Sequence, residues 1–422
     1  MAPDINDSLP SSILKMLSEK GREVYFPKLG ILSQAAEAKG KTYNATLGVA
    51  NEEDGTIMGL PSVTKQVNLD PSKILPYVNS FGRPDLRKSW REMIYKKNPS
   101  LGDTNISLPV VTNALTHGLG IAGHLFLNSG EKLITPSYYW GNYRIVFEHW
   151  HGAKITTFPT FEGPGFNVAG LREMLLAEGD KKVVLLNFPN NPSGYTPINE
   201  EVKTITAAIL EAAEAGKNVV IIIDDAYFGL VYEEGVFTES IFVKLANLHE
   251  RVLAVKIDGA TKEDYVWGLR VGFMTYAYKG MTDEAAEALA DKTGGAIRGN
   301  VSNCSNCSQS IMYEAYQSDT YEAEKREKYE TLQARYKKVR ETLSAHPEYE
   351  EVFTPLPFNS GYFMCIKLKD GLDSEKLRQE LLNRYDTGVI VMPGLLRLAF
   401  ASIPLPKIDK LFENIYLAAK DL

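Results

Sequence analysis

The chain has 422 residues, 44% hydrophobic and 23% charged, so we expect a large core and more than one domain. Its net charge of -7 and pI near 5.6 disfavour sequence-independent binding to nucleic acid. Three cysteines give no disulfide framework, the first residues lack the basic and apolar runs of a signal peptide, and no apolar run approaches the roughly 20 residues that span a bilayer. We therefore expect a soluble cytoplasmic protein.

The N-terminal part contains few regular elements. We expect a short amphipathic helix over 7–20, with Ile13, Leu14 and Leu17 on one face. An extended stretch follows over 44–51, where small residues let the backbone approach another chain or a ligand. A loop over 75–87, interrupted by proline and glycine, leads into a further helix.

Alternating strands and helices then predict a doubly wound α/β domain with a mostly parallel sheet. The apolar runs Val183–Leu186 and Val219–Ile223 are typical of strands buried on both faces of such a sheet. A helix is expected to open at 112–118 and to end near 127, and another to span 199–215. Strands are expected from Val110 and over 132–135, 154–158, 182–188, 218–224, 251–257 and 271–276.

The pattern changes after residue 276. A helix over 283–298 and a polar, turn-rich segment over 299–308 precede a long charged helix over 318–343, which we expect to bridge to a second domain. A hairpin around 359–361, a helix from about 374 and strands near 389 and 397 predict a smaller α+β domain.

Lys262 and Arg270 lie close together in the turn between two expected strands. A lysine can form a Schiff base with an aldehyde, and an arginine can bind phosphate oxygens in a bidentate way. The pair therefore suits a cofactor that carries both groups. By itself the signal is weak, because most lysines are solvated surface residues.

Three successive strands add the groups that a pyridine ring requires. Asn191 follows the first strand, Asp224 ends the second with Tyr227 close behind, and Lys262 follows the third. A carboxylate beside a ring nitrogen keeps that nitrogen protonated, and the protonated ring then withdraws electrons from a substrate. Asn191 could instead cap a turn, and Asp224 could cap a helix.

Two further stretches could contact such a ligand. The helix start at 112–118 offers free N–H groups to a phosphate. The aromatic cluster over 136–143 lies just past a strand end, where open α/β sheets bind ligands. The alternative for each aromatic ring is packing in the core or in an interface.

In these motifs the chain resembles a fold-type I, pyridoxal-phosphate-dependent aminotransferase of the aspartate/aromatic class (class I/II). The resemblance is carried by Asn-Pro-Ser-Gly at 191–194, Asp-x-x-Tyr at 224–227 and Lys-x7-Arg at 262–270. It implies pyridoxal 5'-phosphate as cofactor and a homodimer with shared active sites. It also implies exchange of an amino group between an L-amino acid and a 2-oxo acid such as 2-oxoglutarate by a ping-pong mechanism. We divide the chain into an N-terminal arm with part of the small domain (1–60), a large cofactor-binding domain (61–310) and a small C-terminal domain (311–422).

The resemblance assigns a role to each candidate residue. Lys262 is the Schiff-base lysine and proton carrier, Asp224 pairs with the ring nitrogen, and Asn191 and Tyr227 contact the ring oxygen. Trp140 is expected to stack on the ring, although counting from Pro136 favours Tyr138. The residues expected at the phosphate are Ala114, Leu115, Thr116, Thr261, Arg270 and, from the partner subunit, Tyr77.

Substrate contacts also follow from the resemblance. Arg397 and Asn191 are expected to bind the α-carboxylate, with a backbone N–H from Ala50. Arg298 is expected to take a distal carboxylate across the dimer interface, which predicts aspartate or glutamate as donor without excluding aromatic donors. Its alternative is an exposed arginine at a helix end.

Three departures from the family pattern stand out. Gly259 replaces a hydroxyl residue before the lysine, Tyr143 replaces a histidine, and the segment from Pro393 to Arg397 is short. These departures leave the substrate open. Because the same cofactor supports several reactions, a C–S lyase or decarboxylase on the same scaffold is an alternative, and a non-catalytic regulator is a more distant one. We expect no metal site, because the Cys-x-x-Cys pair at 304–307 lacks the further ligands that zinc requires.

Overall fold

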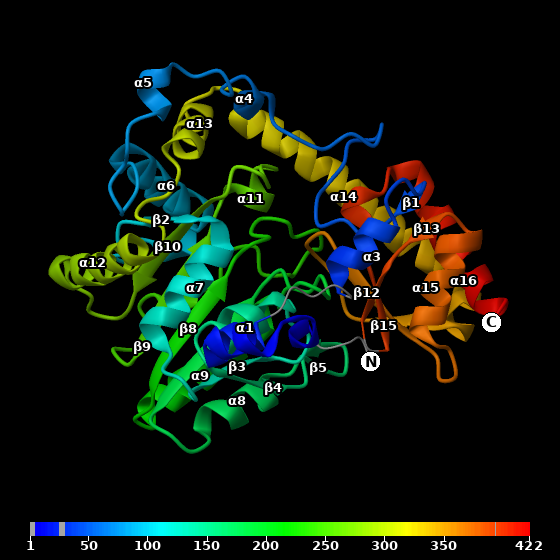
Figure 1. Cartoon of the computed structure of the whole chain (residues 1–422), viewed down its shortest axis with the longest axis horizontal. Helices are drawn as coiled ribbons and strands as arrows, with labels where there is room; N and C mark the ends of the chain where they lie inside the picture. Colours follow the sequence, from blue (N-terminus) through cyan, green and yellow to red (C-terminus); the bar gives the residue numbers. More distant parts are fainter. Residues whose placement is uncertain (1–4, 25–29, 393) are drawn as a thin grey trace.

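A computed structural model describes residues 5–24, 30–392 and 394–422. The first four residues, which entered the signal-peptide argument, and Pro393, at the start of the short segment before Arg397, lie outside these ranges. A seven-stranded sheet forms the centre of the larger domain, and a smaller domain lies beside it (Figure 1). The predicted α/β fold with a second, smaller α+β domain is confirmed.

Six strands of the large sheet are parallel, and β10 is antiparallel to both of its neighbours. The central strands carry the apolar runs and are buried on both faces. In spatial order the strands are β2 (Val110–Asn113), β10 (Val271–Ala277), β9 (Val252–Asp258), β8 (Asn218–Asp224), β7 (Lys181–Asn187), β3 (Lys132–Pro136) and β4 (Lys154–Phe158).

Helices cover both faces of this sheet. One face packs against α7 (Ala114–Phe126) and α12 (Asp283–Asn300), which are also in contact with each other. The other face packs against α8 (Val168–Leu176), α9 (Asn199–Glu214) and the buried side of α6 (Pro84–Lys97). The result is the expected three-layer, doubly wound arrangement.

The smaller domain is built on a four-stranded antiparallel sheet, and α14 (Tyr321–Ala345) connects the two domains (Figure 1). The N-terminal segment joins this domain, because β1 (Tyr43–Asn44) pairs in parallel with β13 (Thr387–Gly388). The sheet order is β11 (Phe353–Pro355), β12 (Met364–Leu368), β15 (Leu395–Leu398) and β14 (Ile390–Met392), packed with α3 (Ile31–Glu37), α15 (Ser374–Arg384) and α16 (Ile408–Lys420). The proposed domain boundaries stay a prediction.

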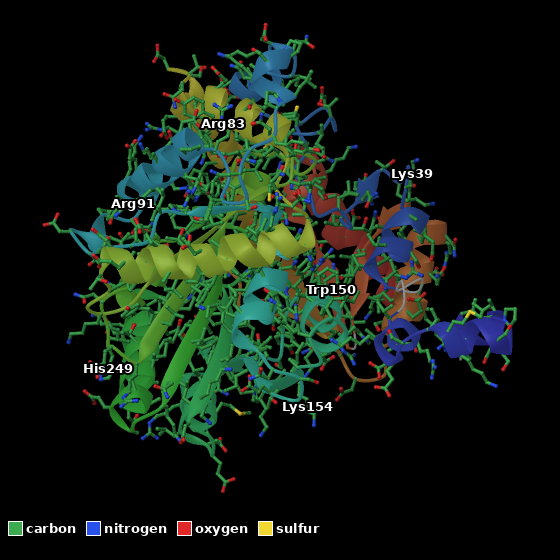
Figure 2. The ribbon with its side chains drawn as sticks, turned by 60° about the vertical axis from the view of Figure 1, so that its left-hand side comes forward. Lys39, Arg83, Arg91, Trp150, Lys154 and His249 are labelled. Atoms are coloured by element: carbon green, nitrogen blue, oxygen red, sulfur yellow. The ribbon has the colours of Figure 1, made fainter. Side chains whose placement is uncertain are left out.

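Two segments differ from the sequence-based expectation. The helix expected over 7–20 is divided into η1 (Ile5–Ser8), α1 (Ser11–Met16) and α2 (Glu19–Glu23), because Leu17 is extended and Ser18 caps the next helix. This N-terminal segment extends away from the body of the molecule (Figure 2). The polar segment expected over 299–308 ends early, because Ser305 caps α13 (Asn306–Tyr316).

The remaining elements are short. Within the described ranges, no helix has both the length and the apolar character needed to cross a membrane. The short elements are α4 (Pro61–Thr64), α5 (Pro71–Ile74), η2 (Pro99–Leu101), the π-helical η3 (Arg144–His149), β5 (Phe161–Glu162), β6 (Gly165–Phe166), α10 (Phe242–Leu245), α11 (Ala260–Glu263), η4 (Pro347–Glu351), η5 (Phe400–Ser402) and η6 (Leu405–Lys407).

Candidate active site

Three neighbouring parallel strands bring polar residues to one edge of the large sheet. In register, Asn187 at the end of β7 lies beside Asp224 at the end of β8, and Asp224 lies beside Ile257 near the end of β9. The loops that follow therefore start from adjacent positions. They carry Asn191, Tyr227 and Lys262 to one place, as the sequence predicts.

A cavity of about 620 Å³ lies at this edge, between the large sheet and the small domain. This volume is within the range of small-molecule and cofactor sites. The apolar side chains of Ile31, Leu47 and Ile145 form part of its wall. The predicted site residues that line it are Ala114, Leu115, Thr116, Trp140, Asn191, Asp224, Tyr227, Thr261, Lys262, Arg270 and Arg397.

Lys262 lies in the one-turn helix α11 and is half-buried. Its Nζ is 3.0 Å from the Tyr227 hydroxyl and 4.4 Å from the centre of that ring. The Tyr362 hydroxyl donates a hydrogen bond of 3.0 Å to the Lys262 carbonyl and so fixes the turn from the side of the small domain. The lysine amine is thus directed into the cavity beside a phenol that can share its proton.

Asp224 is buried at the base of the cavity. Its Oδ2 accepts a 2.5 Å hydrogen bond from the Tyr143 hydroxyl, and its Oδ1 accepts one of 3.1 Å from the Ala226 N–H. Burial raises the pKa of Asp224 to about 6, although the hydrogen bond from Tyr143 opposes this shift. A cationic N–H group in the cavity would stabilise the carboxylate.

The N-terminus of α7 forms a second part of the cavity wall. Ala114 has a φ of 61°, and a Cβ on Gly272 would lie 2.7 Å from the Ala114 carbonyl carbon. Only glycine at 272 therefore lets β10 approach this turn so closely. The unpaired N–H groups of a helix start and the guanidinium of Arg270 both favour an anion such as phosphate.

Arg397 comes from β15 of the small domain and is 3% exposed. Its Nη2 donates to the Thr46 carbonyl at 3.1 Å, its Nη1 lies 3.5 Å from Oδ1 of Asn191, and its guanidinium lies 4.3 Å from the Phe363 ring centre. Burial lowers the pKa of Arg397, but an arginine stays charged at neutral pH. A carboxylate would compensate the buried charge.

Among the described residues of the cavity wall, three buried polar atoms lack a hydrogen-bond partner: Oγ1 of Thr261, Nε1 of Trp267 and Nε of Arg397. Buried donors are normally paired, so these atoms indicate a ligand that carries several acceptors. The cationic side chains of Lys262, Arg270 and Arg397 outnumber the Asp224 carboxylate, which also favours an anionic ligand.

Three predicted residues do not line the cavity of their own chain. Ala50 is fully buried, and its carbonyl accepts a hydrogen bond from Met58, while Leu47 and Gly48 lie at the cavity instead. Tyr77 is 92% exposed. Arg298 lies on the exposed surface of α12 and donates to the Ser302 hydroxyl at 3.1 Å. Their assigned contacts stay predictions.

The two candidates for the stacking ring lie in different places. Trp140 lines the cavity, whereas Tyr138 is absent from its wall and packs 6.0 Å from the Phe161 ring, centre to centre. Several cavity residues have no role assigned from the sequence, among them Thr46, Trp267 and Phe363. Tyr143 stands in the sequence analysis only as the residue in place of a histidine, and its bond to Asp224 is seen in the structure alone. Trp267 could have been noticed within the Lys-x7-Arg motif, whereas Thr46 and Phe363 carry no local signal.

Among the described residues, no three or more His, Cys, Asp or Glu side chains gather as a metal site would require. Cys304 is buried and Cys307 partly buried, and both are free thiols. The Sγ of Cys304 donates to the Val111 carbonyl, as expected of a thiol in a packing role.

Comparisons with known proteins agree on one family. The model of the family described as "Aminotransferase class I and II" matches residues 48–415. A probable aspartate/prephenate aminotransferase of Aquifex aeolicus is 25% identical, over 89% of this chain and 91% of its own length. An aspartate aminotransferase of Musicola paradisiaca is 27% identical, but the match spans only 47% of either chain. The solved structure of an aminotransferase from Anaerococcus prevotii has a TM-score of 0.85 at 24% identity and covers 96% of this chain and 99% of its own, which supports the fold.

Proposed function

Because the chain belongs to the class I and II aminotransferase family, we propose that it moves an amino group between an L-amino acid and a 2-oxo acid. It is a transferase of a family that depends on pyridoxal 5'-phosphate. The observation that carries the proposal is the meeting of Lys262, Asp224 and Arg397 in one cavity. These side chains offer an amine, a buried anion and a carboxylate-binding cation.

The residues in the cavity fit the cofactor. The α7 start with Thr116, together with Arg270 and the unpaired hydroxyl of Thr261, would hold the phosphate, and Trp140 would lie against the ring. When bound, pyridoxal phosphate supplies an aldehyde for the amine and a protonated ring that withdraws electrons. Asp224 would accept the ring N–H, and the cationic ring would stabilise the buried carboxylate.

The residues of the chain would then have separate roles in the reaction. Lys262 Nζ moves a proton to and from the substrate carbon, and the Tyr227 hydroxyl at 3.0 Å orients the amine. Asn191 and Tyr227 would also hydrogen-bond the ring oxygen. Arg397 holds the substrate α-carboxylate, which fixes the position of the reacting carbon.

For substrate we propose aspartate or glutamate, or an aromatic amino acid, as donor and 2-oxoglutarate as acceptor. The two half-reactions share one site, so the first product leaves before the acceptor binds. Arg298 supports a dicarboxylate only from the partner subunit of a homodimer, because it does not line the cavity of its own chain. Tyr77, which is exposed, is proposed to reach the partner's phosphate site in the same way.

We also propose that the enzyme works in the cytoplasm, where its three free thiols stay reduced. The proposed domain division places the cofactor in residues 61–310 and Arg397 in 311–422, so the carboxylate site lies where the two domains meet. Alternatives with the same cofactor are a C–S lyase and a decarboxylase.

The visible absorption spectrum of the protein with pyridoxal phosphate tests the proposal. Glutamate, aspartate and phenylalanine are added separately, and the 2-oxo acid product is measured. We expect one donor to change the spectrum with release of its 2-oxo acid, and 2-oxoglutarate to reverse the change. Release of ammonia or carbon dioxide without this reversal would establish the lyase or decarboxylase instead. If the protein does not alter the cofactor spectrum, the cofactor assignment is wrong.

A further inference from the structure

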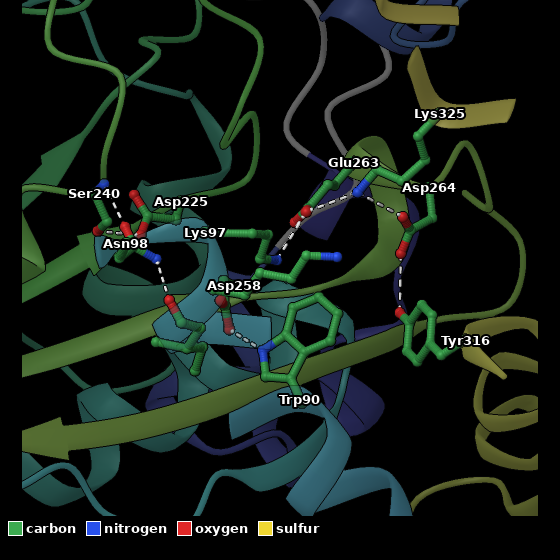
Figure 3. Close-up of polar contacts among 12 residues, drawn as sticks. Trp90, Lys97, Asn98, Asp225, Ser240, Asp258, Glu263, Asp264, Tyr316 and Lys325 are labelled. Carbon is green, nitrogen blue, oxygen red and sulfur yellow. Dashed lines mark hydrogen bonds and ion pairs between the residues drawn. The ribbon is translucent and has the colours of Figure 1, made fainter. Parts of the chain in front are cut away.

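Buried carboxylates lie on both sides of Lys262 in the sequence, Asp258 before it and Glu263 and Asp264 after it, and they belong to one cluster of charged residues. We call this cluster the buried ion network; several of its members and the residues that bind them are shown in Figure 3. None of its members lines the cavity. The network consists of Lys97, Asp225, Lys256, Asp258, Glu263, Asp264 and Lys325.

The first half of the network centres on Lys256, whose side chain is 1% exposed. Its ammonium pairs with Asp225 and, at 3.1 Å, with Asp258. The Ser240 hydroxyl donates to Asp225 at 2.6 Å, and the Trp90 indole N–H donates to Asp258 at 3.0 Å. The two carboxylates are therefore bound on more than one side. Burial opposes the charged form of Lys256, but the charges of Asp225 and Asp258 outweigh it and raise the pKa of this lysine.

The second half lies directly after Lys262 in the sequence. Glu263 accepts from Lys97 and Lys325, both at 2.8 Å, and the lysines hold the pKa of this carboxyl well below its usual range. Asp264 pairs with Lys325 at 3.1 Å and accepts hydrogen bonds from the hydroxyls of Tyr316 and Tyr321. Helices α6, α13 and α14 thereby attach to the segment that carries Lys262.

Two aromatic rings connect the halves. The Lys97 ammonium lies 4.3 Å from the Trp90 ring centre and 5.3 Å from that of Phe228, and the Lys256 ammonium lies 5.0 Å from the same Phe228 ring. Trp90 itself stacks on Phe273 of β10 at 4.2 Å. The network is thus continuous through Trp90 and Phe228, and it is packed against the sheet.

The network lies on the opposite face of the sheet from the cavity. Side chains alternate along a strand, so Lys256 and Asp258 share one face of β9, while Ile257 faces Gly118 of α7. Asp224 pairs in register with Ile257 and so faces α7 as well. Asp225 and Asp258, which contact Lys256, are therefore close in sequence to cavity residues, but their side chains point away from the cavity.

Burying four carboxylates and the Lys256 ammonium, with Lys97 and Lys325 partly buried, is costly in free energy, and well-packed apolar residues would often be at least as stable. Such groups can instead fix one specific arrangement of the chain. Here they bind the segments immediately beyond the ends of β8 and β9, from which Asp224, Tyr227 and Lys262 enter the cavity. Tyr362, which binds the Lys262 carbonyl, is a contact from the small domain.

We propose that the buried ion network positions the Lys262 amine relative to Asp224 and Tyr227, with Lys256 as the residue that couples the ends of β8 and β9. Its members are positioning residues and touch neither substrate nor cofactor. This inference rests on the proposed function, because it assumes that Lys262 binds pyridoxal phosphate. It goes beyond that function by assigning the proton affinity of the Lys262 nitrogen partly to residues on the far face of the sheet.

Two variants distinguish the effect of the network's charge from its effect on the position of Lys262. Lys256→Met removes the central cation and leaves Asp225 and Asp258 facing each other. Lys256→Met/Asp225→Asn removes one cation and one anion, so the net charge of the network is unchanged while the link between the strand ends is lost. The matched control is Lys182→Met on β7, because Lys182 is also buried and donates to the Ala177 and Glu178 carbonyls at the opposite end of the strand.

The first readout is the pH midpoint at which the visible absorption of the protein with bound pyridoxal phosphate changes. Thermal unfolding of the cofactor-free protein is the second. In Lys256→Met we expect the midpoint to change, because Asp225 and Asp258 lose the partner that holds the ends of β8 and β9 together. In the double variant we expect the midpoint to shift by half a pH unit or more, which is about threefold in proton affinity. Because the net charge of the network is unchanged in this variant, such a shift would come from a change in position. In Lys182→Met we expect lower stability at an unchanged midpoint.

An unchanged midpoint in the folded double variant overturns the proposal, as does an equal shift in Lys182→Met. Should neither Lys256 variant fold, Trp90→Phe, which removes the donor to Asp258 and keeps an aromatic ring at that position, is judged by the same criterion. The wild-type protein separates the two hypotheses. If it binds no pyridoxal phosphate, the proposed function fails; if it binds the cofactor normally and the variants match it, only the positioning role fails.

Discussion

The Tyr143 hydroxyl donates a 2.5 Å hydrogen bond to Oδ2 of Asp224 in the interior of the protein. Tyr143 is fully buried, and burial beside the Asp224 charge raises the pKa of the phenol well above its usual value. The phenol therefore stays protonated and acts only as a donor to the carboxylate. A charge-assisted bond of this kind stabilises the anionic form that a ring N–H requires.

Tyr143→Phe is expected to weaken cofactor binding. Loss of a hydrogen bond to a charged group costs about 1.5 to 3 kcal/mol, so we expect roughly ten- to hundredfold lower affinity for pyridoxal phosphate. Titration of the cofactor by absorption or fluorescence measures the change. Tyr139→Phe is the matched control, because its ring stacks 6.2 Å from Tyr143. Equal affinities for Tyr143→Phe and wild type would show that the bond to Asp224 does not support the cofactor.

Ionisation of Asp224 is expected to destabilise the cofactor-free protein. Its pKa is about 6 in the folded state and about 3.9 in an unfolded chain, so the folded protein binds more protons between these values. The free energy of unfolding should therefore fall as pH rises from about 4 to 6, by about 3 kcal/mol in total from this group. The variant Asp224→Asn is the reference, because asparagine has no carboxyl group that ionises in this pH range. Urea unfolding across this pH range should show the stability of wild type falling relative to the variant, and a constant difference would refute the raised pKa.

Arg397→Lys is expected to impair substrate binding while leaving cofactor binding intact. Lysine keeps the charge but loses the planar, bidentate geometry that matches a carboxylate. A loss of about 2 kcal/mol or more corresponds to a rise of roughly thirtyfold or more in KM for every amino-acid donor. Steady-state kinetics measures it, with Arg378→Lys as control, because Arg378 is a buried arginine that pairs with Glu37 and Glu375. Similar KM changes in both variants would contradict a specific role of Arg397.

A mixture of two variant subunits, one inactive and one impaired with aspartate, tests the proposed role of Arg298. Arg298→Gln is expected to raise KM for aspartate but not for phenylalanine, because only the dicarboxylate loses a charge-assisted contact. Hybrids of Arg298→Gln and Lys262→Ala subunits contain one site with Lys262 from one chain and Arg298 from the other. We expect activity with low aspartate to return in these hybrids. No return would place Arg298 outside the partner's site.

The sequence predicted the large sheet well, because its central strands are continuous apolar runs, and such runs indicate buried strands without knowledge of distant contacts. The bounds of β8 (218–224) match the expected strand, and α7 begins within two residues of the expected start. Asn191, Asp224 and Lys262 were placed together because the ends of parallel strands meet at one edge.

Other features depend on contacts that are distant in sequence. Arg397 meets the Thr46 carbonyl, 351 residues away, and no local pattern records that pair. The buried ion network was also missed, since Lys256 lies in a strand where charge argues against burial, and only Asp225 and Asp258 explain it. The helix start at Asn306 was hidden in a polar segment whose serine cap resembles a turn.

The central claim is that Lys262 is the residue that binds the cofactor covalently. Borohydride reduction of the protein mixed with pyridoxal phosphate, followed by peptide mass spectrometry, locates the modified lysine directly. The account predicts one labelled peptide that contains Lys262, with the label lost in Lys262→Ala although that variant still folds. Preferential labelling of another lysine, or equal labelling of Lys262→Ala, would contradict it.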